Sequence, residues 1–242
     1  MEPIFEYQFT LSEMHVDRYG RCRPAVLLYM VQEAAGNHCA FLGVDHDTLA
    51  PLHLFWAVSR NRVQVTRLPR LGETVTLKTW PMPTTRVAYP RAVAAYDKEG
   101  RELFRSISLW ILMDHQSRAM VLPDKSGITV DGTLTGTELS VPRAVAVRPM
   151  ENIRRCAVGY SLLDRNGHMN NTRYMDWVDD LLPSVFHKEH TVREFTVCYM
   201  NEAREGDQVA LRYELTDGPA LTVDATRENG NADRIFSAQI LF

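Results

Sequence analysis

The sequence predicts an α+β protein made of two similar units, each a sheet curled round one helix. Three observations lead to this prediction. The order strand, helix, several strands occurs twice along the 242 residues. Two short motifs of the first half recur in the same order in the second half. A stretch rich in Ser, Gly, Thr and Pro separates the two halves, as expected of a linker.

Composition excludes several classes of protein. Hydrophobic residues make up 45% and charged residues 24% of the chain, which is typical of a globular protein and not of a disordered one. No window is apolar enough for a transmembrane helix, and the start MEPIFEYQFTL lacks the pattern of a signal peptide, so we expect a cytoplasmic protein without membrane contact. The net charge of -3 does not indicate nucleic-acid binding. The four cysteines form no CxxC pair, which disfavours a zinc or redox site.

The first half begins with a strand and a buried helix. Phe5, Tyr7 and Phe9 alternate with polar residues, which predicts a half-buried strand. The helix is expected over residues 24–42, because Pro24 suits a first helical position and Gly43 suits a C-cap. Apolar or small residues lie nearly all round this helix, so we expect it to be buried.

Strands are expected to follow up to residue 114. The alternating residues predict strands at 63–65, 75–79, 86–96 and 103–113, with Lys98, Glu99 and Gly100 as a turn. Within the Ser/Gly/Thr/Pro-rich stretch we place a linker at 131–148, which gives units at 1–130 and 149–242. The second unit is predicted to contain a strand at 156–160, a helix over 174–182 that Pro183 ends, and strands near 195–200, 209–215, 221–226 and 235–241.

Two motif pairs indicate an internal duplication. DRYGRCRPAVLLYM, which starts at Asp17, aligns with DRNGHMNNTRYMDW, which starts 147 residues later at Asp164. LPRLGETV at Leu68 aligns with EAREGDQV at Glu202, 134 residues later. The smaller second spacing means that the first half has a longer connection between its helix and the next strands.

The densest polar cluster lies between a strand and a helix of the second half. Capping of the helix could explain Asn170 and Asn171, but not Asp164, Asn166 and His168 at alternate positions. A hydrolase needs a general base, donors for an oxyanion and a group that orients the base. Glu202, at the end of an apolar strand, is either an exposed strand-end residue or the carboxylate that orients His168 or polarises water.

The equivalent positions of the first half lack this set. His168 corresponds to Arg21, Glu202 to Leu68 and Asn166 to Tyr19, and only the Asp persists, as Asp17. We therefore expect a catalytic site in the second half alone, with Asp17 as a structural turn residue.

The motif D-x-N-x-H-x-N-N-x-x-Y, from Asp164 to Tyr174, resembles the acyl-ACP thioesterases of plants and bacteria. LLYMVQEAAGNHCAFLG resembles the long helix of that family, and LFWAVSRNRVQVTRLPRLGETVTLKTW its next strand pair. The resemblance implies two tandem hotdog domains, each an antiparallel sheet wrapped round a long central helix. It implies hydrolysis of the thioester that joins a fatty acyl chain to acyl carrier protein, which ends fatty acid synthesis. It assigns the catalytic set Asp164, Asn166, His168 and Glu202, gives the first domain the acyl-chain pocket and a degenerate site, and requires neither cofactor nor metal.

One departure bears on mechanism. Plant members have a Cys directly after the glutamate, and this chain has Ala203, so a cysteine nucleophile is impossible there. We expect the side chain of Cys198 to pack in the core. Two mechanisms stay open: His168 and Glu202 activate water while Asn166 and backbone N–H groups near the helix start bind the oxyanion, or Asp164 attacks the thioester itself.

Three rival functions can be compared with this one. An acyl-CoA thioesterase would share the chemistry, and the arginine clusters of the chain suit either an acidic carrier protein or the CoA phosphates. A non-catalytic acyl-binding hotdog protein would have no need of the polar set, and no hydratase motif is present. Acyl chain length, and the choice between monomer and homodimer, are not predicted.

Overall fold

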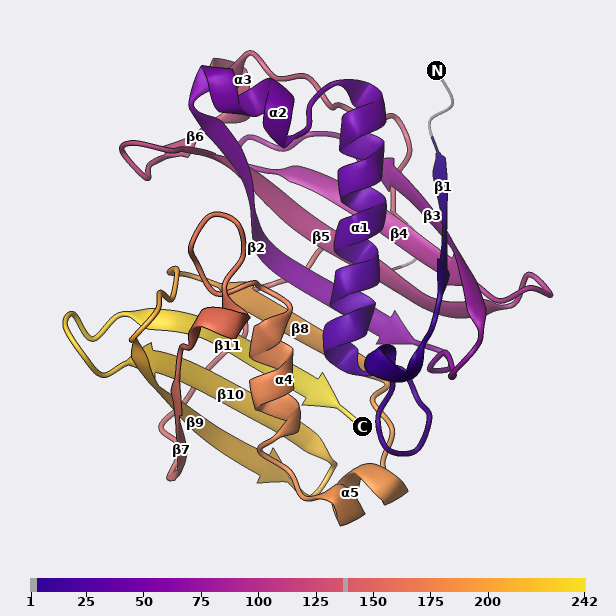
Figure 1. Cartoon of the computed structure of the whole chain (residues 1–242), viewed down its shortest axis with the longest axis vertical. Coiled ribbons are helices and arrows are strands. Elements are labelled where there is room, and N and C mark those ends of the chain that lie inside the picture. The colour runs from indigo at the N-terminus through magenta and orange to yellow at the C-terminus, as the bar shows by residue number, and fades with distance from the viewer. Residues whose placement is uncertain (1–3, 137–138) are drawn as a thin grey trace. The chain divides into compact units, whose positions relative to one another are not determined.

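The computed structural model describes residues 4–136 and 139–242. It divides the chain into two compact units, Met1–Arg23 with Leu27–Pro142, and Pro24–Val26 with Arg143–Phe242. Each unit contains antiparallel strands with a helix across one face of the sheet (Figure 1). The linker expected at 131–148 includes residues 137–138, which lie outside the described residues, and the unit limits drawn from the sequence stay a prediction.

The first unit follows the predicted order of strand, helix and strands. Its strands are arranged β1-β3-β4-β5-β2, all neighbours are antiparallel, and the short β6 pairs with β5. The elements are β1 (Phe5–Thr10), η1 (Glu13–His15), α1 (Pro24–Leu42), α2 (His46–Leu49), η2 (Ala50–Leu52), β2 (Leu54–Val65), β3 (Thr74–Pro81), β4 (Tyr89–Tyr96), β5 (Glu102–Asp114), β6 (Met120–Val121) and α3 (Pro123–Ser126).

Helix α1 has the predicted limits and the predicted burial. Pro24 occupies its first turn, where the missing N–H has no intrahelical role, and Gly43 ends it with a φ of 70° in the left-handed region. Leu27, Met30 and Ala34 are fully buried. Because the helix is apolar on most sides, it is stable only when packed, and the sheet of the first unit supplies that packing.

The sheet of the first unit is covered on both faces. Ala92 and Ala94 of β4 pack with Trp80 and Leu134 on one face, and the indole N–H of Trp80 donates to the Thr135 carbonyl at 3.0 Å. Arg91 points to the opposite face, where it contacts His38 of α1. A strand covered on both faces has no solvent-exposed side, which explains why β4 is buried from Tyr89 to Ala95.

The second unit repeats the plan with shorter helices. Its strands are arranged β8-β11-β10-β9-β7, and all neighbours are antiparallel. The elements are β7 (Asn152–Ala157), η3 (Tyr160–Leu162), α4 (Arg173–Asp179), α5 (Ser184–Glu189), β8 (Glu194–Tyr199), β9 (Gln208–Thr216), β10 (Ala220–Arg227) and β11 (Arg234–Leu241).

Two expectations for the second unit need correction. The central helix is not long: α4 has seven residues and ends at Asp179, not at Leu182. Two aspartates at its C-terminal end oppose the helix dipole, and Pro183 disfavours helical geometry in the residue before it. The strand expected at 156–160 lies instead at Asn152–Ala157, because Gly159 and Tyr160 turn into the short helix η3.

Among the described residues, every helix is too short or too polar to span a membrane.

Candidate active site

The polar cluster predicted from the sequence forms a tight turn before α4. Gly167 has a φ of 76°, which favours glycine, and the Asp164 N–H donates to the His168 carbonyl at 2.8 Å. The Asp164 Oδ1 accepts hydrogen bonds from the Asn166 N–H at 2.8 Å and from the His168 N–H at 3.3 Å. The Asp164 carboxylate therefore holds the turn that presents His168.

The structure brings His168 and Glu202 together. The His168 Nε2 lies 3.1 Å from the Glu202 Oε2, and the side chain of His168 is 13% exposed while that of Glu202 is 36% exposed. A half-buried imidazole against a carboxylate is the arrangement that orients a general base. Arg204 lies farther from the same carboxylate oxygen, at 3.9 Å, so the histidine is the nearer of these two groups.

Asn166 lies on the same turn but outside this pair. Its side-chain amide is 3.5 Å from the Asp164 Oδ2, and the residue is exposed. An exposed amide can donate to an oxyanion of a bound substrate. The four predicted residues therefore form two neighbouring pairs, Asp164 with Asn166 and His168 with Glu202.

The segment that carries Glu202 is held by groups that the sequence analysis did not single out. Arg227 of β10 donates to the Glu202 carbonyl at 2.6 Å and pairs with Asp207 at 3.0 Å and Asp233 at 3.2 Å. The Met169 N–H donates to the Ala203 carbonyl at 2.8 Å, which ties this segment to the turn. The sequence signal that could have identified Arg227 is its position as a basic residue at the end of an alternating apolar strand.

Tyr174, the last residue of the motif, contacts the segment that contains Glu202 and Ala203. It is buried on α4, and burial raises the pKa of its hydroxyl, an effect that a hydrogen bond with the backbone of Ala203 opposes. Asn170 stabilises the turn before α4, since its Oδ1 accepts from the Thr172 N–H at 3.0 Å. The backbone N–H groups near the start of α4 remain predicted donors for the oxyanion.

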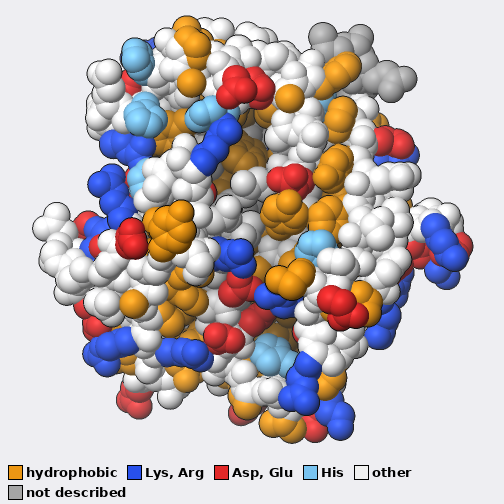
Figure 2. Space-filling model, viewed as in Figure 1, with side chains coloured by type: hydrophobic (Ala, Val, Ile, Leu, Met, Phe, Trp, Pro, Cys, Tyr) orange, Lys and Arg blue, Asp and Glu red, His pale blue; other side chains and the backbone are white. Residues whose placement is uncertain are grey.

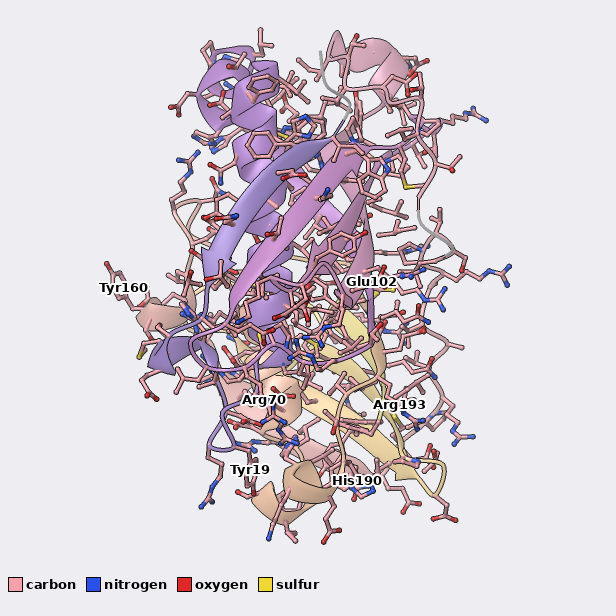
Figure 3. All side chains as sticks on the ribbon, turned by 90° about the vertical axis from the view of Figure 1, so that its right-hand side faces the viewer. Tyr19, Arg70, Glu102, Tyr160, His190 and Arg193 are labelled. Atoms are coloured by element: carbon pink, nitrogen blue, oxygen red, sulfur yellow. The ribbon has the colours of Figure 1, made fainter. Side chains whose placement is uncertain are left out.

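The first unit contains the same turn with different side chains. The Asp17 N–H donates to the Arg21 carbonyl at 2.7 Å, Gly20 has a φ of 71°, and the Asp17 Oδ1 accepts from the N–H groups of Tyr19 and Arg21. The turn at Asp17 therefore repeats the backbone hydrogen bonds of the turn at Asp164. Figure 3 labels Tyr19, which takes the place of Asn166.

Side chains make the first turn chemically inert. The Arg21 Nε donates to the Asp17 Oδ2 at 3.0 Å, so an ion pair stands where the second turn has His168. Leu68, which replaces Glu202, is buried. The first unit keeps the turn and lacks the acid–base pair, as the sequence predicts.

The cysteines offer no alternative nucleophile. Cys198 is buried in the second unit, where its thiol lies 3.6 Å from the Arg143 carbonyl. Burial raises the pKa of the Cys22, Cys39 and Cys156 thiols, which keeps them protonated at neutral pH. No cluster of three or more His, Cys, Asp or Glu suited to a metal ion occurs in the part of the chain that the structure describes.

Comparison with known proteins gives a consistent result. The model of the acyl-ACP thioesterase N-terminal domain matches residues 2–124, and that of the acyl-ACP thioesterase C-terminal domain matches residues 148–235. The chain is 26% identical over 223 residues to the oleoyl-acyl carrier protein thioesterase of Coriandrum sativum, which covers 84% of this chain and 60% of the relative. It is 27% identical over 218 residues to a dodecanoyl-[acyl-carrier-protein] hydrolase of Umbellularia californica. This match covers 82% of this chain and 56% of the relative. The chain thus spans about 60% of the length of these plant relatives.

Solved structures show the same fold. An acyl-ACP thioesterase from Bacteroides thetaiotaomicron superposes with a TM-score of 0.90 at 23% identity, over 99% of this chain and 98% of the other. The 12:0-ACP thioesterase from Umbellularia californica superposes with a TM-score of 0.83 at 21% identity. The superposition covers 100% of this chain and 97% of the other. These similarities confirm the predicted α+β fold of two tandem hotdog units. On the matches of both domain models, the chain belongs to the acyl-ACP thioesterase family.

Proposed function

We propose that this protein hydrolyses the thioester between a fatty acyl chain and acyl carrier protein, releasing a free fatty acid and the carrier thiol. The observation that carries the proposal is the 3.1 Å contact between the His168 Nε2 and the Glu202 Oε2, which joins the turn of the family motif to the segment that follows β8. The relatives named as oleoyl- and dodecanoyl-carrier-protein thioesterases support the choice of carrier.

In the proposed reaction the Glu202 carboxylate accepts a hydrogen bond from the Nε2–H of His168, which leaves Nδ1 as the base. A water oxygen attacks the thioester carbonyl carbon while its proton passes to His168. The tetrahedral oxyanion accepts a hydrogen bond from the Asn166 amide. The C–S bond then breaks, and the proton on His168 passes to the departing sulfur.

Asp164 has a positioning role in this scheme. Its Oδ1 is engaged by two backbone N–H groups, as is the Oδ1 of Asp17 in the first unit, where the acid–base pair is missing. A carboxylate needed for the turn itself is a weaker candidate for a nucleophile. The competing scheme, in which Asp164 attacks and forms a mixed anhydride, is tested below.

We also propose that the first unit holds the acyl chain, on the strength of its long apolar helix and its inert turn. The protein is expected to act in the cytoplasm, as a monomer or a homodimer.

The test is thiol release from acyl-ACP and acyl-CoA with chains of eight to eighteen carbons. Wild type is expected to prefer acyl-ACP, and His168→Ala and Glu202→Gln are each expected to lower kcat by roughly 10²- to 10⁴-fold, as for loss of general acid–base catalysis. Preference for acyl-CoA would move the protein to the second candidate activity. No release from either carrier would exclude a thioesterase.

A further inference from the structure

The face of the first sheet that packs on α1 contains a row of polar side chains. Asn61 of β2 lies opposite Ser108 of β5, and Ser108 lies opposite Arg91 of β4. Residues directly opposite one another point to the same face of a sheet. Arg91 contacts His38 of α1 at 2.9 Å, so this is the face that packs on the helix. Such an interior is normally apolar, so the row requires an explanation.

Several polar atoms on this face of the sheet have no hydrogen-bond partner among the described residues. Within the row they are the Asn61 Oδ1 and the Ser108 hydroxyl, and in the neighbouring rows of β5 they are the hydroxyl of Ser106 and the indole N–H of Trp110. Asn61 is 3% exposed, and Ser106 and Ser108 are fully buried. Buried polar groups in proteins are almost always paired, so these donors and acceptors are suited to receive a polar group of a ligand.

Arg91 adds an uncompensated charge to the row. It is 5% exposed, and its guanidinium contacts the His38 Nδ1, the Thr79 hydroxyl at 3.3 Å and the Cys39 thiol at 3.8 Å. Burial and the nearby guanidinium lower the pKa of His38 to about 4, so these partners are neutral at pH 7. Within the described residues no carboxylate pairs with Arg91, which leaves its charge available to a polar ligand atom.

Apolar side chains adjoin the polar row. Tyr89 and Trp110 lie opposite each other in the next row of the same face, and Trp56 packs edge-on against Tyr89 at 5.0 Å between ring centroids. The cluster around them consists of Val44, Leu49, Leu54, Leu112 and Val130. Figure 2 shows apolar side chains at the bottom of a hollow in the upper half of the view, on the first unit. An alkyl chain fits such surroundings.

We propose that the row Asn61, Ser108 and Arg91 binds a hydroxyl group on the acyl chain, so that hydroxylated acyl chains are the preferred substrate class. A hydroxyl can donate to the Asn61 Oδ1 and accept from Arg91 or Ser108, whereas a carbonyl can only accept. An unsubstituted chain offers neither and would leave the polar atoms unpaired. The inference rests on the proposed function, because it takes the ligand of the first unit to be an acyl chain.

Binding of free fatty acids to the whole chain tests this inference without hydrolysis. Isothermal titration calorimetry would compare unsubstituted acids of eight to eighteen carbons with the same acids carrying one hydroxyl on the third, a middle or the terminal carbon. One hydroxylated series is expected to bind about tenfold more tightly than its parents, as for one additional buried hydrogen bond.

The variants Asn61→Leu and Ser108→Ala are expected to lower that preference to within about twofold, since each removes a polar partner. Ser237→Ala, which removes a buried hydroxyl from the second unit, is the matched control and should keep the preference. Ser108→Ala removes only one oxygen, so it tests whether the preference for hydroxylated acids depends on this row even if Asn61→Leu does not fold.

The two proposals fail separately. Equal binding of hydroxylated and parent acids by a protein that releases thiol from acyl-ACP would overturn the hydroxyl site alone. Selective binding of a hydroxylated acid by a protein that releases no thiol would overturn the hydrolase and leave the hydroxyl site standing.

Discussion

The turns Asp17–Arg21 and Asp164–His168 share their backbone and differ in their chemistry. In both, the aspartate Oδ1 accepts two backbone N–H groups and a glycine with positive φ closes the loop. In the first, Arg21 covers the second carboxylate oxygen, and in the second, His168 turns to Glu202. The two turns therefore share a backbone conformation, and only the second has a histidine at its fifth position that contacts a glutamate.

A third turn shows that the aspartate is structural in this chain. Asp97, between β4 and β5, accepts at Oδ1 from the N–H groups of Glu99 and Arg101 and pairs at Oδ2 with the Arg101 Nε at 2.8 Å. Gly100 has a φ of 77°. Of these three turns, the ones at Asp17 and Asp97 have arginine at the fifth position, which pairs with the aspartate, whereas the turn at Asp164 has His168 there.

The largest effect is expected when the two turns are made alike. His168→Arg places the residue of the first turn in the second, and it is expected to lower thiol release by roughly 10²- to 10⁴-fold because the base is lost. The free energy of unfolding should stay the same or rise by up to about 1 kcal/mol, since Arg can pair with Asp164.

The reverse exchange, Arg21→His, is the control for that prediction. It should leave thiol release unchanged and lower the unfolding midpoint in urea, because Asp17 loses its ion pair. Activity in His168→Arg near the wild-type level would remove His168 from the mechanism.

The next comparison separates the two roles open to Asp164. Asn keeps one side-chain oxygen for the two backbone N–H groups, so Asp164→Asn preserves the turn but cannot form an anhydride. If water is the nucleophile, kcat is expected to fall about tenfold or less, and steady-state thiol release measures it. A loss as large as that of His168→Ala would instead support attack by Asp164.

Asp17→Asn provides the matched change in the first turn. Thiol release should not change, and the stability measured in urea should fall by about 1 kcal/mol through loss of the charged hydrogen bond to Arg21.

A smaller effect is expected from the support of Glu202. Arg227→Met removes the donor to the Glu202 carbonyl, so kcat should fall about tenfold with KM nearly unchanged, because the carboxylate is displaced and not removed. Arg227→Lys should restore part of kcat. Initial rates would be measured well below the unfolding temperature of each variant.

Arg234→Met is the control for Arg227. It removes an ion pair with Asp224 on a neighbouring strand, and the side chain of Arg234 is 44% exposed. Its kcat should match wild type. An equal fall in both variants would mean that any loss of an arginine in this sheet disturbs the site.

The smallest effect concerns the interior of the first unit. The pKa of His38 is lowered to about 4 in the folded protein, from an ordinary value near 6.5 in the unfolded chain. The unfolded state therefore binds a proton first as pH falls, and the free energy of unfolding is expected to fall between about pH 6.5 and pH 4.

Urea unfolding of the whole protein at pH 7, 5.5 and 4.5 measures this dependence. His38→Gln keeps an acceptor for Arg91 and cannot titrate, so its loss of stability over that range should be smaller than that of wild type. Equal losses in both proteins would show that other groups control the acid sensitivity.

Sequence patterns predicted much of the fold. Apolar alternation identified the strands, and Pro24 and Gly43 marked both ends of α1, because these signals act over a few neighbouring residues. The same reasoning overextended α4, where apolar spacing continues past Asp179 but the helix does not. Side-chain periodicity alone does not show where backbone hydrogen bonds stop.

For the site, the sequence by itself predicted which residues could do chemistry and that only the second half contains the His–Glu pair. The tertiary structure decided that His168 meets Glu202, that Arg227 supports Glu202, and that Asn61, Ser108 and Arg91 share one buried row. The physical reason is distance along the chain. Spacing within one element predicts which side chains share a face, whereas contacts between distant segments depend on strand register and packing, which no local pattern encodes.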